Sequence, residues 1–285
     1  MPPEPPSRPV PPAAPGAPTL LVFDSGLGGL TVLAEIDRLR PDARRVYAAD
    51  DEVFPYGTLR EADLVARVMA VMDPLIARHR PDAVVIACNT ASTAVLPPLR
   101  SRWADLAFVG TVPAIKPAVA ASRTRRVSVL ATPGTVKRDY TRDLVRSFAG
   151  DCAVDLVGAP RLAALAEAAL RGEPVPDADI LAEIAPAFVD RDGRRTDRVV
   201  LACTHYPLLL SAFARVAPWP VDYVDPAPAI ARRVDAVLSE RGFATPVTTD
   251  APVRRGTVLF TSGRAPAAAL VRVLAARSLD PIRFQ

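Results

Sequence analysis

Two of the three cysteines in this chain follow nearly identical apolar runs. Cys88 ends the first run in "VVIACNT", and Cys203 ends the second in "VVLACTH". Each run is typical of a buried strand, so each thiol is expected where a strand meets a helix. The amino end of a helix stabilises a thiolate, and a thiol of pKa ~8.5 needs little adjustment to exchange protons near neutral pH. The pair therefore indicates acid–base or nucleophilic chemistry, whereas Cys152 has no comparable context.

Polar side chains come directly after both thiols. Asn89 and Thr90 follow the first, and Thr204 and His205 follow the second. A histidine so close to a cysteine is also compatible with a Cys–His thiol hydrolase that uses Cys203 as its nucleophile. An acyl-enzyme would support that alternative, which gives the first cysteine no role.

A third polar cluster is the sequence "DSGLGG" at residues 24–29, between a predicted strand and a predicted helix. Its backbone amides are suited to an anion. A dinucleotide site is the rival interpretation, because Asp50 ends the next strand, where a ribose-binding acid belongs. Thr31 occupies the third glycine position of that fingerprint, however. Asp24 and Ser25 stand at the carboxyl end of their strand, where their polar groups would face a ligand.

Composition limits the classes of protein. A chain of 285 residues with 50% apolar residues can form one large or two modest domains. Residues 1–18 are rich in proline and are expected to form a disordered arm without the features of a secretory signal. No run approaches the ~20 apolar residues of a membrane span, and three unclustered cysteines favour the cytoplasm. A net charge of +4 with scattered basic residues argues against a nucleic-acid partner.

Cofactor chemistry has little support in this sequence. Pyridoxal phosphate needs a Schiff-base lysine, and the chain has only Lys116 and Lys137, neither in a suitable motif. A metal site needs three or four ligands, and no such cluster is visible. We therefore expect no cofactor and no metal.

Short apolar runs alternate with helical patterns, which predicts parallel α/β structure. The pattern restarts after Gly110, and the repeated Val-Val-x-Ala-Cys run favours a duplication. "VFDSGLGG" and "VLATPGT" are a second matching pair, since each is a strand that enters a glycine-containing turn. The expected strands are 20–23, 45–49, 83–87, 107–110, 126–131, 153–157, 198–202, 221–224 and 257–261; the expected helices are 31–39, one that a Thr58–Glu61 capping box begins, 135–148, 162–170, 178–189, 208–216, 227–241 and 265–277.

Four blocks, "FDSGLGGLTV", "PYG", "ACNTAS" and "CTHYPLL", resemble in order the glutamate racemases of the cofactor-independent aspartate/glutamate racemase family. The likeness runs from about Leu20 to the carboxyl terminus. It implies two similar parallel-sheet α/β domains related by pseudo-twofold duplication, with the active site at their interface. It also implies a discontinuous first domain of residues 19–110 plus 221–285, and a second domain of residues 111–220.

The resemblance also implies residue roles. Racemisation removes the α-proton from one face of the substrate and delivers a proton to the other, and the two thiols would be the acid and the base. The implied catalytic residues are Cys88, Cys203, Asp24, His205 and Glu167, and the implied substrate-binding residues are Asp24, Ser25, Tyr56, Gly57, Asn89, Thr90, Thr204 and His205.

The function implied is the interconversion of L- and D-glutamate, which supplies D-glutamate for peptidoglycan synthesis and so for the cell wall and cell shape. The enzyme would be a cytoplasmic homodimer, with a cell-wall precursor as activator. Two alternatives stand beside the thiol hydrolase: a racemase for aspartate or another acidic amino acid, and a small-ligand binding module without catalysis. Absence of solvent deuterium exchange at the substrate α-carbon would support the binding module.

Overall fold

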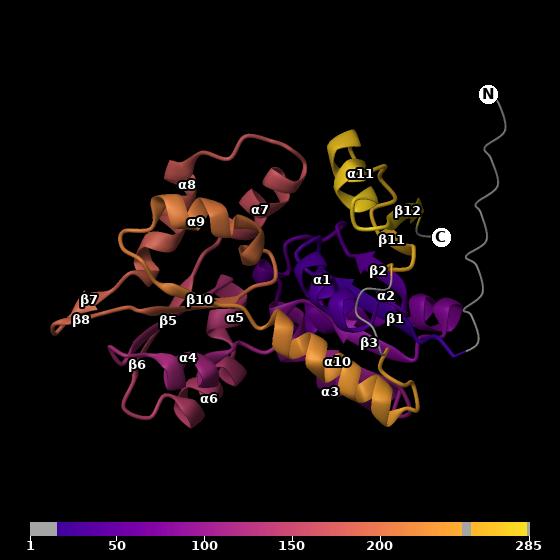
Figure 1. The fold of residues 1–285 in the computed structure, drawn as a ribbon, viewed down its shortest axis with the longest axis horizontal. Coiled ribbons are helices and arrows are strands. Elements are labelled where there is room, and N and C mark those ends of the chain that lie inside the picture. Colours follow the sequence, from indigo (N-terminus) through magenta and orange to yellow (C-terminus); the bar gives the residue numbers. More distant parts are fainter. Residues whose placement is uncertain (1–15, 247–251, 284–285) are drawn as a thin grey trace.

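The computed structural model describes residues 16–246 and 252–283, which form two lobes, each built on a parallel sheet (Figure 1). Residues 1–15 of the expected arm lie outside the described residues. No helix of the described part is long and apolar enough to cross a membrane.

The first lobe contains a parallel sheet of six strands in the order β12-β11-β2-β1-β3-β4. Side chains along β1 alternate between its two faces: Leu20 and Val22 pack on one side, and Leu21 and Phe23 on the other. Both faces are covered by helices, as a parallel sheet requires. The strands are β1 (Thr19–Asp24), β2 (Arg44–Ala49), β3 (Ala83–Ile86), β4 (Ala107–Gly110), β11 (Gly256–Phe260) and β12 (Leu279–Arg283).

Five helices cover this sheet. One face carries α1 (Leu30–Leu39), α10 (Ala227–Glu240) and α11 (Ala268–Ala275). The other face carries α2 (Glu61–His79) and α3 (Asn89–Arg102). A short 3-10 helix, η1 (Tyr56–Thr58), precedes α2.

The second lobe has a parallel sheet of four strands in the order β10-β9-β5-β6. The two apolar clusters on its faces are separate, so this sheet is also covered on both sides. A two-stranded hairpin projects from the lobe (Figure 1). The elements are α4 (Ile115–Ala121), β5 (Arg126–Ala131), α5 (Pro133–Lys137), α6 (Asp139–Phe148), β6 (Ala153–Gly158), α7 (Leu162–Leu170), α8 (Asp177–Ile184), η2 (Ala185–Ala187), β7 (Asp190–Arg191), β8 (Arg194–Arg195), β9 (Arg198–Ala202), η3 (Tyr206–Leu209), α9 (Leu210–Val216) and β10 (Asp222–Val224).

The two sheets share the same order of four parallel strands. The order β2-β1-β3-β4 in the first lobe matches β6-β5-β9-β10 in the second. In each lobe the strand that leads into the cysteine lies next to the strand that opens the repeat. The predicted fold class, two similar parallel α/β domains, is confirmed.

The boundary expected at residue 221 differs from the strand pairing. Asp222, Tyr223 and Val224 of β10 pair with β9 in the second lobe, just as β4 pairs with β3 in the first. The segment that returns to the first sheet therefore follows Val224. The predicted boundary falls too early because β10 is a short strand at the end of the second repeat. The sequence of a short strand does not indicate which sheet it joins.

Two local predictions also differ from the structure. Thr58 lies in η1, where its hydroxyl donates to the carbonyl of Pro55 at 3.1 Å, so the capping box with Glu61 is wrong. The helix expected at 135–148 is broken at Arg138 into α5 and α6. Helix α3 was not predicted, because its Pro97–Pro98 pair is a strong helix-breaking signal.

A buried ion pair joins the amino end of β2 to α1, and the same arginine binds the segment before β12. The Arg45 guanidinium donates to Asp37 at 2.7 Å and to the carbonyls of Arg277 and Ser278, each at 3.2 Å. The Arg45 side chain is fully buried. This pair lies at the opposite end of β2 from the residues discussed below.

Candidate active site

The carboxyl ends of strands from both sheets meet at one buried cavity, and both thiols line it. Cys88 follows β3, and Cys203 follows β9. The cavity measures about 10 Å³, which is close to the room that one water molecule needs. The residues that line it are Ser25, Phe54, Pro55, Tyr56, Gly57, Cys88, Asn89, Thr90, Thr132, Ala163, Cys203, Thr204 and His205.

Cys88 stands immediately before α3, and its sulfur lies 3.8 Å from the Ser25 hydroxyl oxygen. Burial raises the pKa of the Cys88 thiol well above its ordinary value, and the nearby charge of Asp24 adds to this effect. The Ala91 amide and the Ser25 hydroxyl act in the opposite direction but do not outweigh burial. Burial therefore favours the neutral thiol of Cys88, which is the form that carries a proton to deliver.

Cys203 lies beside a buried imidazole. Its sulfur is 3.9 Å from Nδ1 of His205, and Nε2 of the same ring is 2.9 Å from Oε1 of Glu167. Burial by itself lowers the pKa of His205, but hydrogen bonds to Cys203 and Glu167 and the charge of Asp24 raise it well above its ordinary value. The shift favours the protonated ring, which places a cationic N–H group beside the Cys203 sulfur.

Glu167 balances that charge from helix α7. Burial raises its pKa, but the hydrogen bond and charge of His205 and the Leu27 amide lower it more, so the net pKa is below the ordinary value. The His205 Nε2 also lies 3.1 Å from the Gly28 amide nitrogen. A protonated Nε2 donates to Glu167, whereas a deprotonated Nε2 accepts from Gly28, so the two contacts correspond to alternative protonation states.

The amides of the "DSGLGG" loop bind carboxylates of the protein itself. Asp24 accepts from the amides of Ser25 at 2.7 Å and Gly29 at 2.6 Å, and Glu167 accepts from that of Leu27 at 2.6 Å. Burial raises the pKa of Asp24, against the lowering effects of His205 and both amides. A Cβ atom at Gly28 would lie 2.3 Å from Nδ1 of His205. Glycine is needed here because the second lobe packs against the loop.

The Asn89 side chain is buried at the start of α3, and neither its oxygen nor its nitrogen has a hydrogen-bond partner within the described part of the chain. A buried amide without partners is costly, so this group is suited to bind a polar ligand in the cavity. Thr204 donates to Asp24 at 3.4 Å. The Tyr56 hydroxyl instead donates to Asp50, away from the cavity lining, while Gly57 lines the cavity beside it.

The hydroxyls of Thr90, Thr132 and Thr135 form a buried cluster with oxygen–oxygen distances of 2.9 to 3.0 Å. Thr132 lines the cavity, yet it is not among the residues predicted from the sequence. The signal was present, since "VLATPGT" is the repeat counterpart of "VFDSGLGG" and Thr132 stands where the first lobe has Ser25. The structure thus brings every predicted site residue to the cavity or to its immediate hydrogen-bond partners.

Within residues 16–246 and 252–283, no group of three or more histidine, cysteine, aspartate or glutamate side chains is arranged to hold a metal ion.

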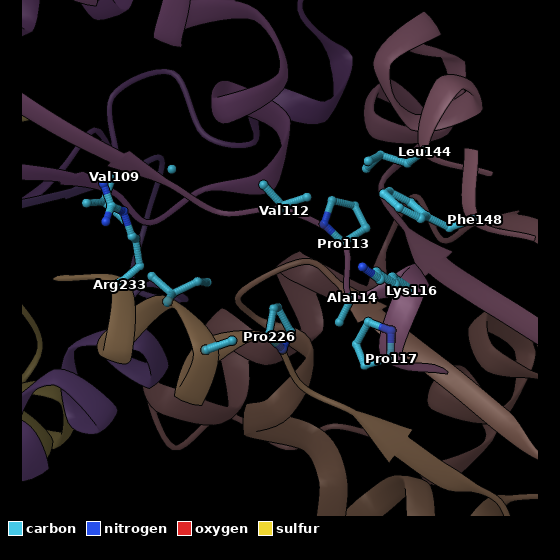
Figure 2. Close-up of a pocket in the computed structure, with 13 residues that line it drawn as sticks. Val109, Val112, Pro113, Ala114, Lys116, Pro117, Leu144, Phe148, Pro226 and Arg233 are labelled. Atoms are coloured by element: carbon cyan, nitrogen blue, oxygen red, sulfur yellow. The ribbon is translucent and has the colours of Figure 1, made fainter. Parts of the chain in front are cut away.

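A second, larger pocket of about 360 Å³ lies between the lobes, apart from the thiols (Figure 2). Its lining comes from both places where the chain crosses between lobes, the segment before α4 and the start of α10. Most of the lining is apolar, and Lys116 and Arg233 contribute its cationic groups. The Lys116 ammonium lies 5.5 Å from the centre of the Phe148 ring.

Fold and site together define a class of protein: a two-lobed α/β enzyme in which each lobe contributes one thiol to a shared buried cavity. Residues 31–234 match the family model described as Asp/Glu/Hydantoin racemase. The chain belongs to the Asp/Glu/hydantoin racemase family, as its sequence blocks indicated.

Individual relatives agree with this assignment. A glutamate racemase of Brucella canis is 58% identical over 222 residues, which are 78% of this chain and 80% of that protein. A glutamate racemase of Sinorhizobium fredii is 54% identical over 245 residues, 86% of this chain and 90% of the relative.

Solved structures give the same result. Escherichia coli glutamate racemase, in complex with L-glutamate and the activator UDP-MurNAc-ala, superposes with a TM-score of 0.83 at 39% identity and covers 94% of this chain and 97% of that one. Glutamate racemase from Thermus thermophilus, in complex with beta-chloro-D-alanine, has a TM-score of 0.73 at 30% identity, with coverage of 95% and 98%.

The contact between His205 and Glu167 generates a prediction. Glu167→Gln removes the charge that stabilises the imidazolium, so His205 should lose its proton at a lower pH than in the wild type. Side-chain ¹⁵N NMR across a pH titration measures this directly. Arg171→Gln is the control, because Arg171 is half-exposed and lies 3.6 Å from the other Glu167 oxygen. Identical titrations in wild type and Glu167→Gln would contradict the assignment.

Proposed function

We propose that this protein is a glutamate racemase, an isomerase that interconverts L- and D-glutamate, with Cys88 and Cys203 as its acid and base. The single observation that carries the mechanism is that the two thiols, one from each lobe, line the same buried cavity. The identities of 54–58% to curated glutamate racemases support the substrate.

One turnover moves two protons. With L-glutamate bound, the Cys203 thiolate takes the α-proton, and the Cys88 thiol gives its own proton to the opposite face. The turnover ends with Cys203 as thiol and Cys88 as thiolate, which is the starting state for D-glutamate. The His205–Glu167 pair favours the thiolate of Cys203, and burial keeps Cys88 protonated, so the two environments suit opposite roles in the L-to-D direction.

In a reaction without a cofactor, the carbanion between the two transfers needs stabilisation from the protein. Donors placed on the substrate α-carboxylate supply it in a cavity from which water is largely excluded. Ser25, Asn89, Thr90 and Thr204 line the cavity and carry suitable groups. Asn89 is the best placed to gain from a ligand, because its amide has no partner in the described part of the protein.

Glutamate is much larger than a cavity of about 10 Å³. We infer that the lobes separate to admit substrate and close for the reaction, as in other enzymes whose active site lies between domains. The division into two domains, with the second ending after Val224, is part of this proposal, as are the homodimer, the cytoplasmic location and the supply of D-glutamate to peptidoglycan.

Competing functions have less support. A thiol hydrolase would use Cys203 and His205 and leave Cys88, on the other side of the same cavity, without a role. An aspartate racemase would use the same two thiols, but the curated relatives compared above are glutamate racemases.

A regulatory ligand is the second part of the proposal. The E. coli relative was solved with the activator UDP-MurNAc-ala. We propose that a similar precursor binds here in the pocket of Figure 2, where Lys116 and Arg233 would meet a diphosphate and the apolar lining would meet its rings. A ligand at both chain crossings could shift the angle between the lobes.

Arg233→Ala should weaken binding of UDP-MurNAc-ala about tenfold, since one charge-assisted hydrogen bond contributes roughly 1.5 kcal/mol. Racemisation without activator should be unchanged. Isothermal titration calorimetry measures the affinity, and Arg232→Ala is the matched control, because Arg232 is a neighbour on α10 that does not line the pocket. Equal affinities for both variants and wild type would place the ligand elsewhere.

Replacing either active-site thiol tests the mechanism. Cys88→Ser and Cys203→Ser should each reduce racemisation roughly 10²–10⁴-fold, because a hydroxyl is a far weaker base. Circular dichroism with each enantiomer of glutamate and of aspartate, without added cofactor, measures the rate and the substrate preference. Cys152→Ser is the control, since Cys152 lies outside the cavity.

The two variants should also differ from each other. On a β-substituted glutamate that needs a single proton abstraction, Cys203→Ser should still eliminate the leaving group from the D-form, and Cys88→Ser from the L-form. Full racemisation by either variant would remove that cysteine from the mechanism.

A further inference from the structure

Asp50 lies just behind the cavity wall. It follows β2, its side chain is fully buried, and it is not among the residues that line the cavity. Its amide donates to the carbonyl of Asp24 at 2.8 Å, which extends the pairing of β2 with β1 towards the site. The mechanism described above gives Asp50 no role.

The Asp50 carboxylate accepts hydrogen bonds from three side chains of distant segments. Its Oδ2 atom accepts from the Tyr56 hydroxyl and from Nε of Arg67 at 2.9 Å. Its Oδ1 atom accepts from Nη2 of Arg67 at 2.5 Å and from the Thr261 hydroxyl at 2.6 Å. One carboxylate therefore joins the end of β2, the 3-10 helix η1, helix α2 and the end of β11.

This network fixes one wall of the cavity. Tyr56 is buried, and its hydroxyl is occupied by Asp50, so Tyr56 faces the cavity with its ring and backbone. Gly57 continues that wall and touches the other lobe, because a Cβ atom on Gly57 would lie 2.9 Å from Cβ of Thr132. A shift of Tyr56 would therefore change both the cavity and the contact between lobes.

The charge of Asp50 matters as well as its shape. Burial raises its pKa, but hydrogen bonds from Arg67, Thr261 and Tyr56 lower the pKa more, so the group stays a carboxylate. An asparagine has one oxygen and one amide nitrogen. In either orientation its nitrogen, a donor, would face a donor of the Arg67 guanidinium.

We propose that Asp50 is a positioning residue of this racemase, which holds Tyr56 and Gly57 in the conformation that binds substrate. The inference rests on the proposed function, because it assumes that the cavity between the thiols is the substrate site. Asp50 acts through Tyr56 and makes no contact with the cavity itself.

Steady-state kinetics of Asp50→Asn test the proposal. We expect KM for glutamate to rise about tenfold, while kcat stays within about threefold, because the wall is displaced and the thiols are not. Thr261→Val removes one hydrogen-bond donor and keeps the carboxylate, so it should raise KM by a smaller factor. This variant also tests the proposal if Asp50→Asn does not fold. When Asp50→Asn and Tyr56→Phe are combined in one protein, their separate effects on KM should not be additive.

Asp37→Asn is the matched control. Asp37 also pairs with a buried arginine, Arg45, but at the amino end of β2, far from the cavity. Both aspartate variants should lower the melting temperature, and only Asp50→Asn should raise KM. An unchanged KM in Asp50→Asn and Thr261→Val, or an equal rise in Asp37→Asn, would overturn the proposal. Wild-type protein that fails to racemise glutamate would instead overturn the proposed function.

Discussion

The hydrogen bonds around Glu167 are the interaction on which the site depends. This buried carboxylate on α7 accepts from the Leu27 amide of the first lobe and contacts His205 beside the second thiol. A single side chain thus joins the lobes and, together with Cys203 and Asp24, raises the pKa of the imidazole beside Cys203. The loop approaches so closely because it has glycine where a Cβ atom would collide with His205. In the proposed mechanism, the contact that orients the imidazole is therefore also a contact between the lobes.

The two halves of the fold place their cysteines at equivalent positions, to which the proposed mechanism gives opposite roles. Each repeat places its cysteine at the end of the strand beside its first strand, so the two thiols reach one cavity from two sides. Their surroundings have diverged: Cys88 lies near a carboxylate and a hydroxyl, and Cys203 near a protonated ring. A reaction that is nearly symmetric between enantiomers needs this pairing of one acid with one base.

Local patterns predicted most of the fold, and the resemblance to the racemase blocks named the side chains that gather at the cavity. Strands β4, β5 and β9 and helix α7 have the predicted bounds, because continuous apolar runs and helical periodicity are local signals. The partner of β10, the helix that contains Pro97–Pro98, and the Asp50 network depend on contacts between distant residues. Thr261 is 211 positions from Asp50, and no local pattern indicates that they meet. Thr132 was missed because "VLATPGT" was interpreted only as a strand that enters a glycine-containing turn.

The most direct test of the two-thiol account is racemisation of L-glutamate in D₂O, followed by NMR of both enantiomers early in the reaction. If one thiol removes the proton and the other delivers a solvent-derived one, the D-glutamate formed will carry deuterium while the remaining L-glutamate stays protonated at Cα. The same pattern should appear in reverse from D-glutamate. Early deuterium in the unreacted enantiomer, or transfer of the original proton into product, would show a single shared base and contradict the account.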